Sequence, residues 1–201
     1  MNSISTKPGQ VKSVYLGGRI AHTDWRHDIA ENLRGAVINA DPQLDEPLRT
    51  ELLPTMRVQG GPTHISGPYF ISCDHGGFHG PGSHGVGADY SESRCCPFEM
   101  MYPNPRTYAV QRCMTWLRDA DVMFVWAGPD FHHAHGTHAE MGVAHALGKP
   151  IFAAVASGAL TDSMNEEQVE TWFAMELARS FPAPDPVSGF AAFVRMVAEK
   201  R

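Results

Sequence analysis

The sequence has little clustered positive charge and no long apolar run. Its formal net charge is −6, and its Lys and Arg residues are scattered along the chain. Proteins that bind nucleic-acid polymers carry clustered cations that neutralise phosphates, and a bilayer-spanning helix needs roughly 18 to 20 consecutive apolar residues. We therefore expect neither a nucleic-acid polymer nor a membrane as a partner. A small anionic ligand is compatible with this composition, because backbone amides alone can bind an anion.

Cysteine is also scarce, and its spacing indicates neither a disulfide framework nor a thiolate zinc site. The chain has 4 cysteines, of which Cys95 and Cys96 are adjacent, and no Cys-x-x-Cys pair occurs. Such pairs are the usual signature of thiolate zinc ligands. The first ten residues are polar and lack the apolar core of a signal peptide. These features predict a cytoplasmic protein with free thiols.

Strand-like and helix-like segments alternate along most of the chain. Strands are expected at 11–18, 36–40, 121–128 and 150–156, and helices at 23–35, 106–120, 137–148, 164–181 and 186–201. In the helix at 164–181 the expected buried face is Val169, Trp172, Phe173 and Leu177. The alternation predicts one α/β domain over residues 1–201, a Rossmann-like three-layer sandwich with a mainly parallel sheet.

Residues 42–105 interrupt this alternation. The range is rich in proline and glycine, and within it only 68–72 reads as a strand. Because it also contains several aromatic residues, we expect an ordered, loop-rich insertion and not a disordered segment. Its glycine-rich part, 72–94, is either a cluster of turns or a lid over the ligand. In the second case Asp74 and His75 are candidate ligand contacts.

Ligands of parallel α/β sheets bind beyond the carboxyl ends of the strands. The segment that leaves the first strand carries Gly17, Gly18, Asp24 and Arg26, which are candidate ligand contacts. The alternatives are simple: Asp24 caps a helix and Arg26 points to solvent. The segments after 121–128 and after 150–156 leave the same edge of the predicted sheet, so we expect all three to converge on one pocket.

Glu140 lies in the second of these segments, where two readings of its role are compatible with the sequence. Thr137 and Glu140 have the spacing of a helix capping box. A carboxylate beside a helix N-terminus is also held ionised by the helix dipole, as a nucleophile that attacks an anomeric carbon must be.

Histidines crowd two loops, and their spacing permits metal binding without matching a known ligand pattern. One loop holds four of them and the other three: His132, His133, His135 and His138, then His75, His79 and His84. His-x-His and His-x₃-His spacings can supply ligands, but no His-Glu-x-x-His motif occurs. Solvent-exposed residues, substrate contacts and acid–base groups are the alternatives. We predict neither a metal nor another cofactor.

Three stretches together resemble the nucleoside 2-deoxyribosyltransferase family and its relatives that hydrolyse nucleoside 5′-monophosphates. VYLGGRI resembles the opening strand of the family, and LRDADVMFVW resembles its helix-to-strand junction. GTHAEMGVAHALGKPIF resembles its signature, in which a catalytic glutamate is followed by a small-residue helix and Gly-Lys-Pro. The resemblance covers about residues 12–40 and 106–156.

The resemblance implies a Rossmann-like enzyme that cleaves the N-glycosidic bond of a nucleoside or nucleoside 5′-monophosphate. Glu140 would attack C1′ of the sugar and form a ribosyl-enzyme ester, which water or a second base resolves, with hydrolysis slightly preferred over transfer. Tyr15 would hold Glu140, and the neighbouring Gly136, Thr137 and His138 are candidate ligand contacts. A homodimer or larger homo-oligomer is also implied.

One position departs from the family pattern. The family usually places an aspartate where this chain has Cys113, and a thiol does not replace a carboxylate as a hydrogen-bond acceptor. The acid role would then pass to another residue, for which Asp74, Asp89, His135 and His138 are candidates. Alternatively, the protein binds a nucleoside or nucleotide on the same fold without catalysis.

Overall fold

The computed structural model of the chain describes residues 11–20, 25–29, 55–58, 61–68, 105–156 and 166–198. The described strands form one six-stranded sheet in the order β2-β3-β1-β4-β5-β6. In chain order they are β1 (Ser13–Gly17), β2 (Thr55–Val58), β3 (Gly61–Ser66), β4 (Val122–Ala127), β5 (Ile151–Ala156) and β6 (Arg179–Ala183). All pairings are parallel except that of the edge strand β2 with β3.

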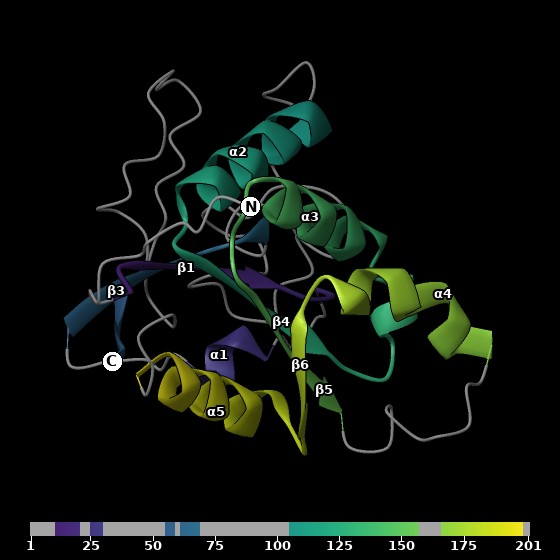
Figure 1. Cartoon of the computed structure of the whole chain (residues 1–201). Helices are drawn as coiled ribbons and strands as arrows, with labels where there is room; N and C mark the ends of the chain where they lie inside the picture. The colour runs from purple at the N-terminus through teal and green to yellow at the C-terminus, as the bar shows by residue number, and fades with distance from the viewer. Residues whose placement is uncertain are drawn as a thin grey trace, which may run out of the picture.

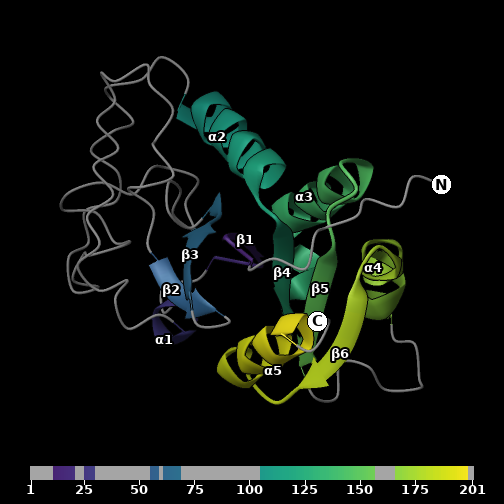
Figure 2. The same cartoon turned by 60° about the vertical axis from the view of Figure 1, so that its left-hand side comes forward.

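Helices cover both faces of the sheet, as Figures 1 and 2 show. They are α1 (Arg26–Ile29), α2 (Pro105–Asp119), the short 3₁₀ helix η5 (Phe131–His133), α3 (His135–Ala146), α4 (Glu166–Glu176) and α5 (Pro186–Ala198). α1 and α5 lie on one face, α2 and α3 lie on the other, and α4 lies beside α3 near β6. The predicted α/β three-layer sandwich with a mainly parallel sheet is confirmed.

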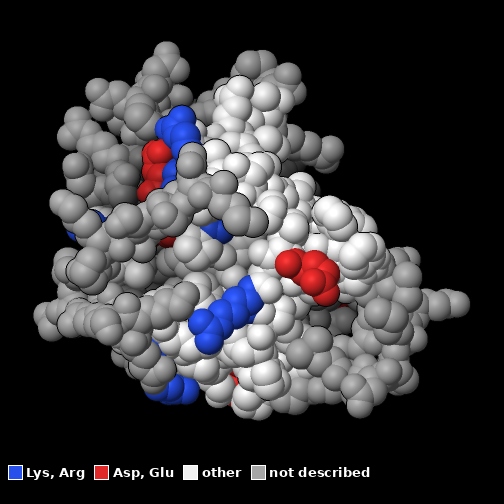
Figure 3. Space-filling view, in the orientation of Figure 1, with Lys and Arg blue, Asp and Glu red and all other residues white. Residues whose placement is uncertain are grey.

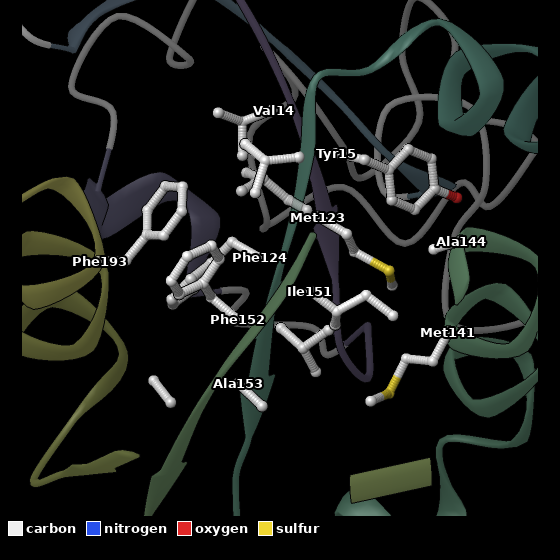
Figure 4. Close-up of a cluster of buried hydrophobic side chains, with 14 of the residues drawn as sticks. Val14, Tyr15, Met123, Phe124, Met141, Ala144, Ile151, Phe152, Ala153 and Phe193 are labelled. Carbon is white, nitrogen blue, oxygen red and sulfur yellow. The ribbon is translucent and has the colours of Figure 1, made fainter. Parts of the chain in front are cut away.

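The central strands are apolar because helices bury both of their faces. In Figure 4, Tyr15 and Met123 point toward α3, where Met141 lies, while Phe124 points toward α5 and Phe193. The ring centroids of Phe124 and Phe193 are 5.3 Å apart. Alternate residues of each strand therefore supply two separate core layers, which fixes the register of the sheet.

α5 begins and packs through residues that the sequence supplies locally. Pro186 is its first residue, and Asp185 just before it accepts hydrogen bonds from the backbone N–H and the hydroxyl of Ser188, both at 2.7 Å. This is a side-chain cap of the helix N-terminus. Further along, a Cβ on Gly189 would lie 2.6 Å from the Cβ of Ala154. Small residues on both elements therefore let α5 lie close against β5.

The range 42–105 is not wholly an insertion, because β2 and β3 lie within it and belong to the central sheet. β3 pairs in parallel with β1. The strand expected at 36–40 is not among the described residues, and neither is most of the rest of 42–105. The predicted strand 68–72 is wrong at Pro68, which follows the end of β3. Gly61 and Pro62 read as turn residues in the sequence, yet they open β3, ahead of His64, where the pairing of β3 with β1 begins.

The helix predicted at 164–181 is shorter than expected. α4 ends at Glu176, and Arg179–Ala183 forms the edge strand β6. Trp172 and Phe173, expected on the buried face, are 54% and 65% exposed, while Ala174 is buried. α4 lies at the border of the sheet and turns Ala174 toward the core, with Met175 and Leu177 partly buried against it.

On the described part of the face drawn in Figure 3, charged side chains lie in small groups with uncharged surface between them. They form no continuous cationic surface there. Among the described residues, exposed ion pairs join Arg19 with Asp130 and Arg118 with Asp119. Within the described ranges, no helix is both long enough and apolar enough to cross a membrane.

Candidate active site

The order of the strands changes direction between β1 and β4. The chain after β1 turns to α1 on one face of the sheet, whereas the chain after β4 turns to α3 on the other face. Such a change of direction opens a ligand-binding crevice at the carboxyl ends of the two strands. The residues at this edge of the sheet are Gly17, which ends β1, Gly18 after it, and the first turns of α3 after β4. An exposed ion pair of 2.8 Å between Arg19 and Asp130 joins the two loops.

Glu140 and Tyr15 form a buried pair beneath this crevice. The Tyr15 hydroxyl donates a hydrogen bond of 2.6 Å to Oε1 of Glu140. Tyr15 is fully buried and Glu140 is 6% exposed. The second carboxylate oxygen, Oε2, is buried and has no hydrogen-bond partner among the described residues. A carboxyl group with one oxygen held and one uncommitted is poised to interact with a ligand.

Burial raises the pKa of Glu140 to about 7, although the hydrogen bond from Tyr15 and the charge of Arg26 both act to lower it. The pKa of Tyr15 is raised well above its ordinary value, first by burial and then by the charge of Glu140. Tyr15 therefore stays protonated and remains a donor, while Glu140 changes its charge near neutral pH.

Cys113, on α2, lies close to the Tyr15–Glu140 pair. Its side chain is 5% exposed, and burial together with the charge of Glu140 raises the pKa of its thiol. The thiol is therefore neutral beside the carboxylate. The position at which the resembled family has an aspartate thus faces Glu140 in this fold, but here it holds a group that neither repels the carboxylate nor supplies a second one.

Arg26 is completely buried, so the alternative that it points to solvent is wrong. Its Nη2 donates to the carbonyl oxygens of Leu16 at 3.3 Å and Gly18 at 3.0 Å, and its guanidinium lies 4.5 Å from the centre of the Trp25 ring. These contacts fix the end of β1 and the turn that follows. The same cation acts on Glu140 through its charge, so Arg26 connects the shape of the crevice with the ionisation of the carboxyl group.

The capping-box reading of Thr137 and Glu140 is wrong. α3 begins at His135 with Ala134 at its N-cap position, and no side chain caps it. The Thr137 hydroxyl instead accepts a hydrogen bond of 3.1 Å from the backbone N–H of Gly18. A Cβ on Gly17 would lie 3.2 Å from the Thr137 methyl and 2.5 Å from Cε of Met123. Glycine therefore allows α3 to approach β1 closely enough for Glu140 to reach Tyr15.

Gly136 and His138 flank Glu140 on α3 but lie on different sides of the helix. Gly136 precedes Glu140 by one turn on the same face, and a Cβ there would meet nothing within 4 Å. His138 lies about 160° around the helix from Glu140. Its ring packs on Phe131, with centroids 4.7 Å apart, and burial lowers its pKa. The structure thus brings Gly136, and not His138, next to Glu140.

Three of the candidate ligand contacts, Asp24, Asp74 and His75, lie outside the described residues, as does Asp89. His135 is exposed on α3. In the described ranges, no three His, Cys, Asp or Glu side chains are grouped so that they could hold a metal ion. Those same ranges place no second carboxylate beside Glu140, so they do not identify the acid.

Two polar groups near the crevice were missed by the sequence analysis. The hydroxyl of Ser66 and the indole N–H of Trp25 are buried and have no hydrogen-bond partner in the described part of the chain. Trp25 was considered only as a packing residue. Ser66 immediately precedes Gly67-Pro68 at the end of a strand, a placement that would have marked it as a residue at the carboxyl edge of the sheet.

Replacing Tyr15 with phenylalanine is expected to raise the pKa of Glu140 above about 7. The Tyr15 hydroxyl stabilises the ionised carboxylate, so its loss favours the protonated form. The measurement is a carbon-13 NMR titration of the Glu140 side-chain carboxyl in both proteins. An unchanged titration midpoint would show that the hydrogen bond at Oε1 does not stabilise the charged form.

No protein-family model matches the sequence, and no curated protein matches it either. Several solved structures match weakly, and two of them are the following. One is a CMP N-glycosidase of Clostridium botulinum, with a TM-score of 0.32 and 14% sequence identity, matching 45% of this chain and 72% of that one. The other is a conserved protein from Enterococcus faecalis V583, with a TM-score of 0.35 and 14% identity, matching 94% of this chain and 87% of that one. Neither similarity is high enough to assign a family.

Proposed function

We propose that the protein cleaves the N-glycosidic bond of a nucleoside or nucleoside 5′-monophosphate, with Glu140 as the nucleophile. The observation that carries the proposal is the buried Tyr15–Glu140 pair at the carboxyl edge of β1, in which Oε1 is held and Oε2 has no partner within the described residues. The residues that resemble the deoxyribosyltransferase signature supply this glutamate and this tyrosine.

The chemistry follows from the two carboxylate oxygens. Oε2 attacks C1′ of the sugar, the bond between C1′ and the base nitrogen breaks, and the base leaves with the electron pair and takes up a proton. The product is an ester between C1′ and Glu140, as in retaining glycosidases. Water, or a second base, then attacks C1′ and releases the Glu140 carboxylate. Tyr15 holds Oε1 throughout, so that Oε2 stays aligned.

The ionisation of Glu140 suits this role near neutral pH. Only the charged carboxylate is a nucleophile, and with a pKa of about 7 it is half ionised at pH 7. A less acidic carboxylate is also the stronger nucleophile, so the pKa balances the amount of the reactive form against its reactivity.

A second candidate is a non-catalytic nucleoside- or nucleotide-binding protein on the same fold. It is favoured by one observation: the neutral thiol of Cys113 stands beside Glu140 where the resembled family has an aspartate. Such a protein would bind the ligand and be stabilised by it, but it would not release a free base.

Assembly into a homodimer or larger oligomer stays a prediction, based on the resemblance alone. Sedimentation equilibrium of the purified protein measures its mass directly. A monomer of 22.0 kDa over the whole concentration range would contradict it.

Base release from a panel of substrates tests the proposed function. The purified protein is incubated with ribo- and deoxyribonucleosides and with their 5′-monophosphates, with and without a second free base, and the products are separated by chromatography. We expect base release from at least one substrate. Dependence on the added base identifies transfer, and independence identifies hydrolysis. Thermal stabilisation by a nucleotide without any base release would instead support the binding protein.

A further inference from the structure

Ser66 is the last residue of β3 and lies beside Tyr15 in the sheet. The two residues are register partners across the parallel β1–β3 pair. Because partners in a parallel pair point to the same face of the sheet, Ser66 shares with Tyr15 the face that α3 covers. It also lies at the carboxyl end of its strand, the edge at which ligands of such sheets bind.

The hydroxyl of Ser66 is buried and has no hydrogen-bond partner among the described residues. The residue is 1% exposed, and its Oγ forms no hydrogen bond with any described residue. Thr63 on the same strand provides the contrast, since its equally buried hydroxyl donates a hydrogen bond of 2.7 Å to the carbonyl oxygen of Val11. A buried hydroxyl without a partner is costly, and it calls for an explanation.

The backbone after Ser66 holds this hydroxyl in place. Gly67 has a φ of +146°, and a Cβ on it would lie 2.5 Å from the carbonyl oxygen of Leu16. The turn is thus pressed against β1 and requires glycine. Ser66 Oγ and Glu140 Oε2 are two buried oxygens that have no partner in the described ranges. Both belong to residues that adjoin Tyr15, Ser66 as its register partner and Glu140 as its hydrogen-bond acceptor.

We propose that Ser66 is a specificity residue whose hydroxyl forms a hydrogen bond with a sugar hydroxyl of the ligand at Glu140. The proposal rests on the proposed function. The nucleophile attacks C1′ from the side opposite the departing base, so the sugar, and not the base, lies against Glu140 and its neighbours. A serine hydroxyl both donates and accepts, which matches a sugar hydroxyl that does the same.

The test compares ligands with and without sugar hydroxyls in the Glu140→Gln protein, which binds without turnover. The probes are the four common ribonucleoside 5′-monophosphates and their 2′,3′-dideoxy counterparts, titrated by calorimetry. Addition of Ser66→Ala is expected to weaken ribonucleotide binding about three- to tenfold and to leave dideoxynucleotide binding unchanged. The thermal midpoint of the unliganded protein should not fall, because the substitution removes a buried hydroxyl that has no partner among the described residues.

Thr63→Val is the matched control, since it removes a buried hydroxyl from the same strand. It should lower the thermal midpoint, because its hydrogen bond to Val11 is lost, and it should leave the preference for ribonucleotides unchanged. Equal weakening of both ligand classes by Ser66→Ala, or no weakening, would overturn the assignment of Ser66. If wild-type protein releases base in that case, only this assignment fails. If wild-type protein neither binds nor cleaves any probe, the proposed function fails and this inference fails with it.

Discussion

Glu140→Gln is expected to abolish base release and at the same time to stabilise the folded protein above neutral pH. An amide is not a nucleophile toward C1′, and loss of a covalent nucleophile costs about a thousandfold in rate or more. The amide nevertheless keeps an oxygen that can accept the hydrogen bond from Tyr15. The fold should therefore remain intact while the chemistry is lost.

The gain in stability follows from the raised pKa of Glu140. In the unfolded chain the group ionises near its ordinary value of 4.5, and in the folded protein near 7. Between these values the native state holds a proton that the unfolded state has lost, so the free energy of unfolding falls as the pH rises through this window. The loss is complete above pH 7 and amounts to about 3 kcal/mol, at about 1.4 kcal/mol for each unit of pKa.

Glutamine carries no charge, so the free energy of unfolding of the variant does not fall in this way as the pH rises. Urea denaturation at pH 5 and pH 8 should show the variant gaining stability relative to the wild type as the pH rises. Glu176→Gln is the matched control, because Glu176 is exposed at the end of α4 and its substitution removes the same charge. A Glu140→Gln protein that still releases base at the wild-type rate would exclude Glu140 as the nucleophile.

The parts of the fold that could be predicted are the buried elements whose apolar residues follow a regular spacing in the sequence. β4 is flanked by helices on both faces, so Val122–Ala127 is a continuous apolar run. In α5, Phe190 and Phe193 are buried on one helical face, which is a clear amphipathic pattern.

Edge strands leave no comparable pattern. β6 exposes most of its side chains and is held to β5 by backbone hydrogen bonds, which any residue can form. Its sequence therefore read as the end of a helix. β3 lies between β2 and β1 and is not an edge strand; it was missed because Gly61 and Pro62 are turn residues elsewhere.

Some residues of the candidate site could likewise be predicted from the sequence, and others could not. The pairing of Tyr15 with Glu140 was implied by the resemblance, and the hydrogen bond between them is present. The placement of Arg26 could not be predicted, because the two partners of its Nη2 are carbonyl oxygens of Leu16 and Gly18, and a carbonyl carries no sequence signal. Ser66 was missed for a related reason, because it is distinguished by a buried hydroxyl that forms no hydrogen bond with any described residue.

Arg26→Met is expected to lower the free energy of unfolding by about 2 to 4 kcal/mol, and by more at pH 8 than at pH 5. The substitution removes the donors to Leu16 and Gly18 at every pH. At pH 8 it also removes the cation that acts on ionised Glu140, whereas at pH 5 Glu140 is protonated and needs no counter-charge. The uncharged groups that remain at the carboxyl, Tyr15 and Cys113, do not replace it.

A double-mutant cycle separates the two effects of Arg26. In the Glu140→Gln background the stability cost of Arg26→Met should no longer depend on pH, because the carboxylate is absent. The coupling energy between the two sites, obtained from all four proteins of the cycle, should therefore appear only above pH 7. Arg26→Lys keeps a charge but loses the planar fork and its stacking on Trp25. It should therefore lose stability at both pH values alike. A cost of Arg26→Met that is equal at pH 5 and pH 8 would show that Arg26 holds the turn after β1 without influencing the charge of Glu140.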